Sequence, residues 1–295
     1  MTFKKFAPLF PLLAGVLWGL TGIFVRHLNG IGINNFHLTF SRSFFAAVSL
    51  VTYLLITDKS QLIVNPKDLW CFFGTGILSV LSFSVCYFYT LMHSSVSVAV
   101  ILAYTSPFFV IILSAILFRE KITVLKSVAL IMATAGCFLL CKTDKNTPVT
   151  AGLIAVGLLA GLAYASYSIF ARFVVGKYPP LVITAYTFIF SSIGSLFLVD
   201  FKEFAAACSA SPSSIFTIFI FSLVSSLMPY TLLTIGLKYV ETGKAAILTT
   251  TEVLTASLVG ILFFREKITA AGILGIFLIL AAVVLINIKL SPKRF

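Results

Sequence analysis

Charged residues are scarce in this sequence, and acidic residues are the scarcest. Only 10% of the 295 residues are charged, with 9 Asp and Glu against 21 Lys and Arg. Soluble domains are about 25% charged, so this composition excludes an ordinary soluble protein. The net charge of +12 comes without an arginine cluster or a basic stripe that could bind phosphates. We therefore expect no nucleic-acid partner.

Residues that bind metals or catalyse reactions are also few. The chain has 3 His and 5 Cys, and no cysteine pair has metal-site spacing with histidines. Most of the cysteines lie inside apolar runs, where a thiol is usually a small apolar filler. The sequence contains no GxSxG or HExxH motif and no pair of acids deep in an apolar run. We therefore expect no metal, no cofactor and no enzyme activity.

Apolar residues take the place of the missing charge. The chain is 60% hydrophobic and has a mean hydropathy of +1.10. A run of about 18 apolar residues or more can cross the hydrocarbon core of a membrane as a helix. The expected fold class is therefore an all-α polytopic membrane protein with ten transmembrane helices. These helices are expected at 8–27, 35–57, 69–90, 95–118, 123–141, 150–175, 181–199, 213–236, 243–264 and 269–288.

One charged hexamer occurs twice in the chain. FREKIT at 118–123 returns letter for letter at 264–269, a shift of 146 residues (264 − 118). The same shift aligns LLAG at 12–15 with LLAG at 158–161 without a gap. Matches that keep one register along the chain indicate an internal duplication. The sequence therefore predicts two five-helix repeats in one membrane domain, 1–146 and 147–295.

The odd number of helices in each repeat determines its symmetry. After five crossings the second repeat starts on the opposite side of the membrane, which gives an inverted-topology repeat. Of the 21 Lys and Arg, 14 lie in segments on the side of the N-terminus and 6 on the other side, while Arg42 lies within a helix. By the positive-inside rule, both termini are expected in the cytoplasm and the protein in the inner or plasma membrane.

Several short motifs resemble a known family. Trp18-Gly19 lies in the first expected helix, Arg42 in the second and PFF at 107–109 in the fourth, and Arg-Glu-Lys follows the fourth and the ninth. With ten helices in two inverted fives, these motifs resemble the drug/metabolite transporter superfamily, most closely its ten-helix EamA-type branch. Two positions depart from the family pattern. Arg replaces Gly before Glu-Lys, and the Glu-Pro-Val of the ninth helix is EVL at 252–254, without the proline that could break this helix.

The resemblance implies a secondary transporter that works by alternating access. Its two five-helix halves would expose a central cavity to one side of the membrane at a time. Export is the direction that the resemblance favours, and proton coupling is an option. An uncoupled facilitator of the same fold and, less favoured, a channel are the alternatives.

Two ionisable residues lie inside apolar runs, where charge is costly and usually functional. Glu252 is about ten residues into the helix at 243–264, and its repeat equivalent is Ser106. It could bind a cationic group, carry a coupling proton, or only bond to neighbouring hydroxyls. Arg42 is about seven residues into the helix at 35–57, where it could attract an anionic group or only anchor the helix. If both face one cavity, an amino-acid-like zwitterion would fit there.

Hydroxyl and aromatic side chains at matching depths complete the candidate site. By the repeat, their faces converge on one cavity that suits a small amphipathic solute, although a single hydroxyl more often joins two helices. Glu252 is also the candidate for ion coupling. The candidate substrate-binding residues are Trp18, Arg42, Ser79, Tyr87, Tyr104, Ser106, Tyr164, Ser225, Tyr230, Thr251 and Glu252.

Other features are interpreted as structural. Pro107 can open the backbone ladder of its helix, and GxxxG pairs at 15–19 and 157–161 let helices pack closely. The helices at 123–141 and 269–288 lack acids and have few hydroxyls. We expect them to form a scaffold or a homodimer surface within the lipid bilayer. The two hexamers are expected to hold hairpins on opposite faces of the membrane.

Overall fold

The computed structural model describes residues 6–94, 96–140, 150–211, 213–265 and 269–287, which are helices joined by short loops, with no strand among them. Nine helices within these ranges are long and apolar enough to span a membrane, and Val124–Leu140 is a shorter apolar helix. The expected all-α fold with ten membrane helices is therefore confirmed.

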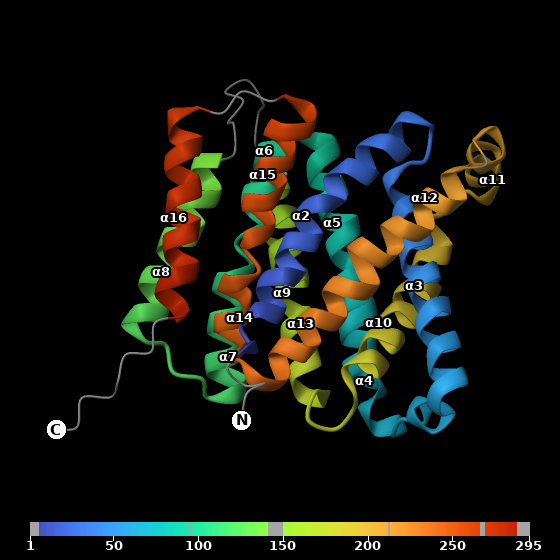
Figure 1. The fold of residues 1–295 in the computed structure, drawn as a ribbon, viewed down its shortest axis with the longest axis horizontal. Coiled ribbons are helices and arrows are strands. Elements are labelled where there is room, and N and C mark those ends of the chain that lie inside the picture. The colour runs from blue at the N-terminus through green and yellow to red at the C-terminus, as the bar shows by residue number, and fades with distance from the viewer. Residues whose placement is uncertain (1–5, 95, 141–149, 212, 266–268, 288–295) are drawn as a thin grey trace.

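Each half of the chain contributes five membrane helices, and two in each half consist of shorter pieces (Figure 1). The expected boundaries that fall on described residues agree with the structure within a few residues, while the expected start at 95 and the expected ends at 141 and 288 lie outside the described residues. The first half contains α2 (Leu9–Gly30), α3 (Asn35–Asp58), α4 (Leu69–Phe73) with α5 (Ser82–His93), α6 (Val96–Ala103) with α7 (Ser106–Phe118), and α8 (Val124–Leu140). The second contains α9 (Ala151–Val174), α10 (Pro180–Ser195), α12 (Ser213–Ser222) with α13 (Met228–Tyr239), α14 (Thr242–Leu248) with α15 (Thr251–Phe264), and α16 (Ala270–Asn287).

The two halves are interleaved. α2 packs along α13, α14 and α15, while its repeat equivalent α9 packs along α5, α6 and α7. We call these sets the α2 group and the α9 group. α3 packs on α10, and α8 packs on α16 at one edge of the molecule, on the left of Figure 1. Each group thus contains helices from both halves, so the contacts within each group connect the two repeats.

Glycines allow the central helices to approach closely. A Cβ added at Gly19 of α2 would lie 2.6 Å from the Glu252 carbonyl oxygen of α15. At the equivalent place in the other half, a Cβ at Gly161 would lie 2.9 Å from the Leu102 carbonyl oxygen of α6. Ordinary contacts of a Cβ begin at 3.4 Å. The two GxxxG pairs therefore serve the close packing that the sequence indicates.

The α6–α7 and α14–α15 helices are interrupted at nearly equivalent positions. The first break falls at Tyr104–Thr105, shortly before Pro107, and the second at Thr249–Thr250, where no proline follows. The hydroxyl of Thr249 donates to the Ala246 carbonyl at 2.8 Å, and that of Thr250 donates to the Ile247 carbonyl at 2.7 Å. Side-chain hydroxyls thus donate hydrogen bonds to backbone carbonyls beside the break. The α14–α15 helix is therefore interrupted even though it lacks the proline of the family pattern.

The third and eighth membrane helices contain π-helical stretches, which the apolar pattern does not predict. They cover Gly74–Leu81 between α4 and α5, and Leu223–Leu227 between α12 and α13. Residues 77–81 and 223–227 are equivalent under the repeat shift. Such stretches inside α-helices are frequent at functional sites, and these two contain Ser79 and Ser225.

The arginines that replace the family's glycine end α7 and α15 in the conformation that glycine favours. Arg119 has φ 55° and Arg265 has φ 53°, both in the left-handed region. A helix commonly ends with a left-handed residue, usually glycine, because other residues are strained there. The rest of the second hexamer, at 266–268, lies outside the described residues.

One helix at the edge of the bundle is not predicted by the apolar pattern. α11 (Phe201–Ala210) lies between α10 and α12, on the right of Figure 1. The Asp200 carboxylate accepts hydrogen bonds from the backbone N–H of Lys202 at 2.9 Å and of Glu203 at 3.2 Å. Asp followed three residues later by Glu is a capping signal, so the sequence held the information for this helix start.

Candidate functional site

Glu252 is the second residue of α15, directly after the break in that membrane helix. The hydroxyl of Tyr164 on α9 donates a hydrogen bond to Glu252 Oε2 at 2.6 Å. Tyr104, in the break between α6 and α7, lies near the same carboxylate. Because Glu252 belongs to the α2 group and Tyr164 to the α9 group, the hydrogen bond between them joins the two groups at their interface.

Aromatic rings form a wall beside this carboxylate. The Trp18 ring of α2 meets Tyr230 edge to face with centroids 5.0 Å apart, and meets Tyr164 at 6.0 Å. The indole Nε1–H of Trp18 donates to the Ser225 carbonyl at 3.1 Å. Phe83 of α5 packs on the other side of Tyr164, with centroids 5.0 Å apart. Edge-to-face packing and a bonded indole hold these rings in fixed positions.

Arg42 faces the same region from α3. Its Nη2 donates to the Ser84 hydroxyl at 3.3 Å, and its charge acts on Glu252, Tyr164 and Tyr230. Among the described residues, Arg42 and Glu252 form no direct ion pair. The site therefore presents one cationic and one anionic group that interact with each other but are not in contact.

The cavity beside the aromatic rings is small. A cavity of about 20 Å³ lies against Trp18, Ser106, Tyr164 and Tyr230. A single water needs about 10–15 Å³ on the same measure, so the cavity is large enough for about one water. This cavity is therefore too small for a metabolite, and the side chains or helices around it would have to move before cargo could bind there.

The structure brings most of the sequence-predicted candidates together. The residues that meet around Glu252 and the cavity are Trp18, Arg42, Tyr104, Ser106, Tyr164, Tyr230 and Glu252 itself. Ser225 takes part through its carbonyl.

Three candidates lie away from this centre. The Thr251 hydroxyl donates to the carbonyls of Leu12 and Leu248, both at 3.0 Å, so it joins α2 to α15. Ser79 is buried but does not line the cavity. The Tyr87 ring stacks on Phe83, with centroids 5.4 Å apart, and Phe83 in turn contacts the Tyr164 ring.

Sequence reasoning missed several residues of the site. Phe83 is one of 30 phenylalanines, and no pattern distinguishes it from those that face lipid. Ser84, the partner of Arg42, is a serine of α5 that no pattern in the sequence distinguishes from serines that only join helices. Tyr167 also lines the cavity, and its hydroxyl is hydrogen-bonded to the Thr234 hydroxyl at 2.6 Å. Its place one turn from Tyr164 was the available signal.

Fold and site together define a duplicated helical membrane protein with a closed polar site between its interleaved halves. The model of the EamA-like transporter family matches this chain twice, over residues 5–141 and 151–288. The chain belongs to the EamA-like transporter family, as the sequence motifs indicate. It is thus a multi-pass membrane transporter.

Curated relatives support the same class. An uncharacterized transporter of Archaeoglobus fulgidus is 28% identical over 278 residues, which cover 93% of each chain. The pseudopaline exporter CntI of Pseudomonas aeruginosa is 27% identical over 129 residues, 44% of this chain and 45% of its own. One solved crystal structure has the same fold, with a TM-score of 0.79 at 17% identity, over 95% of this chain and 96% of the other.

Proposed function

We propose that this transporter is a secondary carrier that exports a small amphipathic, amino-acid-like metabolite by alternating access. The observation that carries the proposal is the Glu252 carboxylate, hydrogen-bonded to a tyrosine that lines a small cavity, with the opposite charge of Arg42 acting on the same two residues. An ammonium group can bind at the carboxylate and a carboxylate group at the guanidinium, while the rings of Trp18 and Tyr230 contact the apolar part.

Glu252 is also the proposed site of proton coupling. Its carboxylate accepts a hydrogen bond from the Tyr164 hydroxyl, and the Tyr104 phenol lies near it. A proton on Glu252 would weaken the bond from Tyr164 and free this tyrosine for the cargo. Cargo and proton would then compete for one carboxylate, which is the simplest way to exchange one for the other.

Transport into proteoliposomes tests this proposal. Purified wild-type protein and the Glu252→Gln variant are supplied with a mixture of radiolabelled amino acids, with and without a pH gradient. We expect saturable uptake by the wild type that rises with the gradient, and a fall of about tenfold or more in Glu252→Gln, because loss of a hydrogen-bonded charge costs about 1.5–3 kcal/mol.

Glu203→Gln is the matched control, since the Glu203 side chain is 58% exposed and lies on α11, at the edge of the bundle. Equal uptake by Glu252→Gln and Glu203→Gln would refute the assignment of Glu252. A saturable uptake rate that does not change with the pH gradient would identify the uncoupled facilitator. A flux that does not saturate with substrate concentration would identify a channel.

The membrane, the orientation and the oligomer are part of the proposal. The excess of Lys and Arg in segments on the N-terminal side supports cytoplasmic termini in the inner or plasma membrane. A homodimer through α8 and α16 would have to use their outer faces. Their inner faces pack on each other within one chain, where a Cβ at Gly136 would lie 2.7 Å from the Gly275 carbonyl oxygen.

A further inference from the structure

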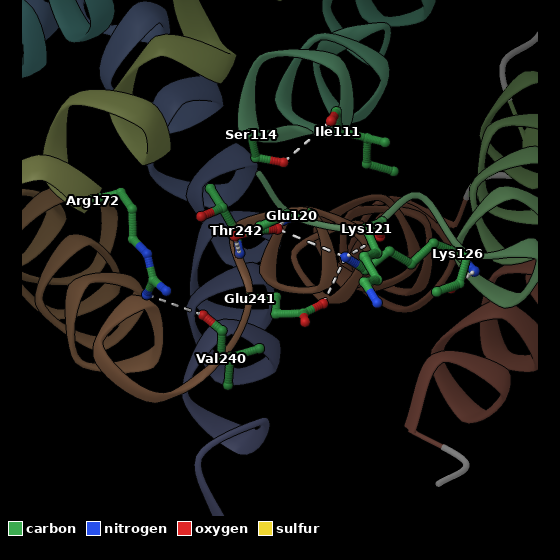
Figure 2. A network of polar contacts seen from close by, with 11 residues as sticks. Ile111, Ser114, Glu120, Lys121, Lys126, Arg172, Val240, Glu241 and Thr242 are labelled. Atoms are coloured by element: carbon green, nitrogen blue, oxygen red, sulfur yellow. Dashed lines mark hydrogen bonds and ion pairs between the residues drawn. The ribbon is translucent and has the colours of Figure 1, made fainter. Parts of the chain in front are cut away.

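The loop that contains the first hexamer reaches across to the other half of the chain. The Glu120 carboxylate, between α7 and α8, accepts hydrogen bonds from the N–H of Thr242 at 2.7 Å and of Gly243 at 3.2 Å (Figure 2). These two N–H groups begin α14, and Glu241, the residue that precedes α14, makes no capping bond of its own. The start of a helix needs such acceptors, so α14 receives its cap from the opposite repeat.

Lys126 connects the same two segments by charge. Its Nζ lies 2.6 Å from Glu241 Oε2 and 3.7 Å from Glu120 Oε2, and it donates to the Lys121 carbonyl at 3.0 Å. The side chains of Lys126 and Glu120 are only 7% and 8% exposed, whereas Glu241 is 58% exposed. Buried charges are stable only while they are paired. The pairing therefore depends on the α7–α8 loop and the α13–α14 loop being in contact.

Arg172 adds a third connection at this end of the bundle. It lies in the last turn of α9 and donates to the carbonyls of Leu237 and Val240 at the end of α13. Figure 2 shows it beside the Glu120–Lys126 contacts. We call Glu120, Lys126, Arg172 and Glu241 the latch. Arg172 joins the α9 group to the α2 group directly, and Glu120 does so from the loop that follows α7.

The opposite end of the bundle does not carry the same charges. Under the 146-residue shift, Lys126 corresponds to Gly272 and Glu241 to Ser95, while Arg172 corresponds to Arg26 and Glu120 to Glu266. An ion pair equivalent to Lys126–Glu241 cannot form from a glycine and a serine. The two ends of an inverted repeat exchange roles during transport, so this pair stabilises closure at one end only.

We propose that the latch is the gate of the cytoplasmic end and makes the closed conformation of that end the resting state. The inference rests on the proposed alternating-access function and on the proposed orientation. When the end opens, water replaces each contact, because the loops lie at the membrane surface. The contacts can therefore break and re-form in every cycle, and cargo bound between the groups has to overcome them.

Accessibility of a single cysteine tests the gate without any substrate. Ser114 of α7 is buried just inside the latch, and a Cβ at Gly243 would lie 3.8 Å from its hydroxyl and 3.7 Å from Glu120 Oε2. Ser114→Cys is introduced into a full-length chain whose native cysteines are replaced. A membrane-impermeant maleimide is then applied to inside-out and to right-side-out vesicles.

With Lys126→Ala, we expect labelling of Ser114→Cys from the cytoplasmic side to become about tenfold faster, a population shift of about 1.4 kcal/mol. Lys126→Arg should keep labelling slow. The matched control is Lys121→Ala, which removes the same charge from an exposed side chain of the same loop. Faster labelling in both alanine variants, or in neither, would overturn the proposal, as would faster labelling from the outer side.

Glu241→Gln provides a second variant if Lys126→Ala does not fold, because Glu241 is more than half exposed. It should also speed cytoplasmic labelling, and an unchanged rate would count against the latch. The labelling requires no cargo. The labelling experiment can therefore refute the proposed gate while proteoliposome assays support transport by the wild type. Conversely, the transport assay can refute the carrier function while the labelling rates support the gate.

Discussion

A methyl group at Gly19 should damage both stability and transport. In Gly19→Ala the new Cβ would lie 2.6 Å from the Glu252 carbonyl oxygen and 2.9 Å from the Ala256 amide nitrogen, both backbone atoms of α15. Ordinary contact begins at 3.4 Å, so α2 and α15 have to separate by about 0.8 Å. Backbone atoms of a helix cannot move aside singly, and the whole interface beside Glu252 is displaced.

The size of the effect follows from the cost of overpacking, which is about 1–3 kcal/mol. At about 2–4 °C per kcal/mol for a chain of this size, the melting temperature in detergent should fall by roughly 5 °C. Transport should fall further than stability does, because a displacement of nearly 1 Å moves the Glu252 carboxylate away from Tyr164, where the hydrogen bond now measures 2.6 Å.

Gly22→Ala is the matched control on the same helix. Nothing lies within 4 Å of a Cβ at Gly22, and alanine in a helix interior is favoured over glycine by roughly 0.5–1 kcal/mol. Thermal unfolding followed by size-exclusion chromatography, together with uptake in proteoliposomes, compares the two variants at equal protein amounts. If Gly19→Ala melts and transports like Gly22→Ala, close packing of α2 on α15 does not position the site.

Three further substitutions examine single features of the structure. Tyr164→Phe removes the donor to Glu252 and should lower uptake about tenfold, because a hydrogen bond to a charged group contributes about 1.5–3 kcal/mol; uptake equal to that of the wild type would remove Tyr164 from the site. Arg119→Gly relieves a left-handed residue at φ 55° and should raise the melting temperature by a few degrees, since glycine adopts this conformation without strain; a lower value would contradict this. The Glu120 carboxyl is buried, which alone raises its pKa, but hydrogen bonds from Thr242 and Gly243 and the Lys126 charge outweigh burial and hold the pKa below its ordinary 4.5. Its contribution to stability is complete above about pH 4.5 and is lost as the pH falls through the lower folded pKa. Thermal melts should therefore be insensitive to this group from pH 5 to 8 and drop in stronger acid, and Glu120→Gln should show a smaller acid drop than the wild type.

The register of the repeat was the part of the fold that sequence reasoning could recover. Hydropathy gives the spans, because a membrane requires long apolar helices, and the hexamers at 118 and 264 align them. The break at Thr249–Thr250 could not be recovered in this way. A proline lacks the backbone N–H, so the sequence alone shows where it can interrupt a helix. The hydrogen bonds from the threonine hydroxyls to backbone carbonyls can be identified only in the folded helix.

The candidate site was recovered where it depended on residue type and missed where it depended on contact across the chain. Glu252 and Arg42 stand out because charge is rare in an apolar run. Nothing local indicates that Glu120 caps α14, since its partner amides are 122 and 123 residues away. The hexamer therefore looked like a hairpin element in the sequence, and its connection to the other repeat required the structure.

The positions at which the two repeats differ have a special meaning in this architecture. If the halves were identical, the inward-open and outward-open states would be related by the pseudo-two-fold axis and would have equal energy. Any preference between the states must therefore come from unequal pairs. One unequal pair is Ser106 and Glu252, near the cavity, and another is Lys126 and Gly272, where Lys126 belongs to the latch at one end of the bundle. Exchanging Lys126 for glycine should thus bring the two states closer in population, and this would be measured as cysteine labelling rates from the two sides that approach one another.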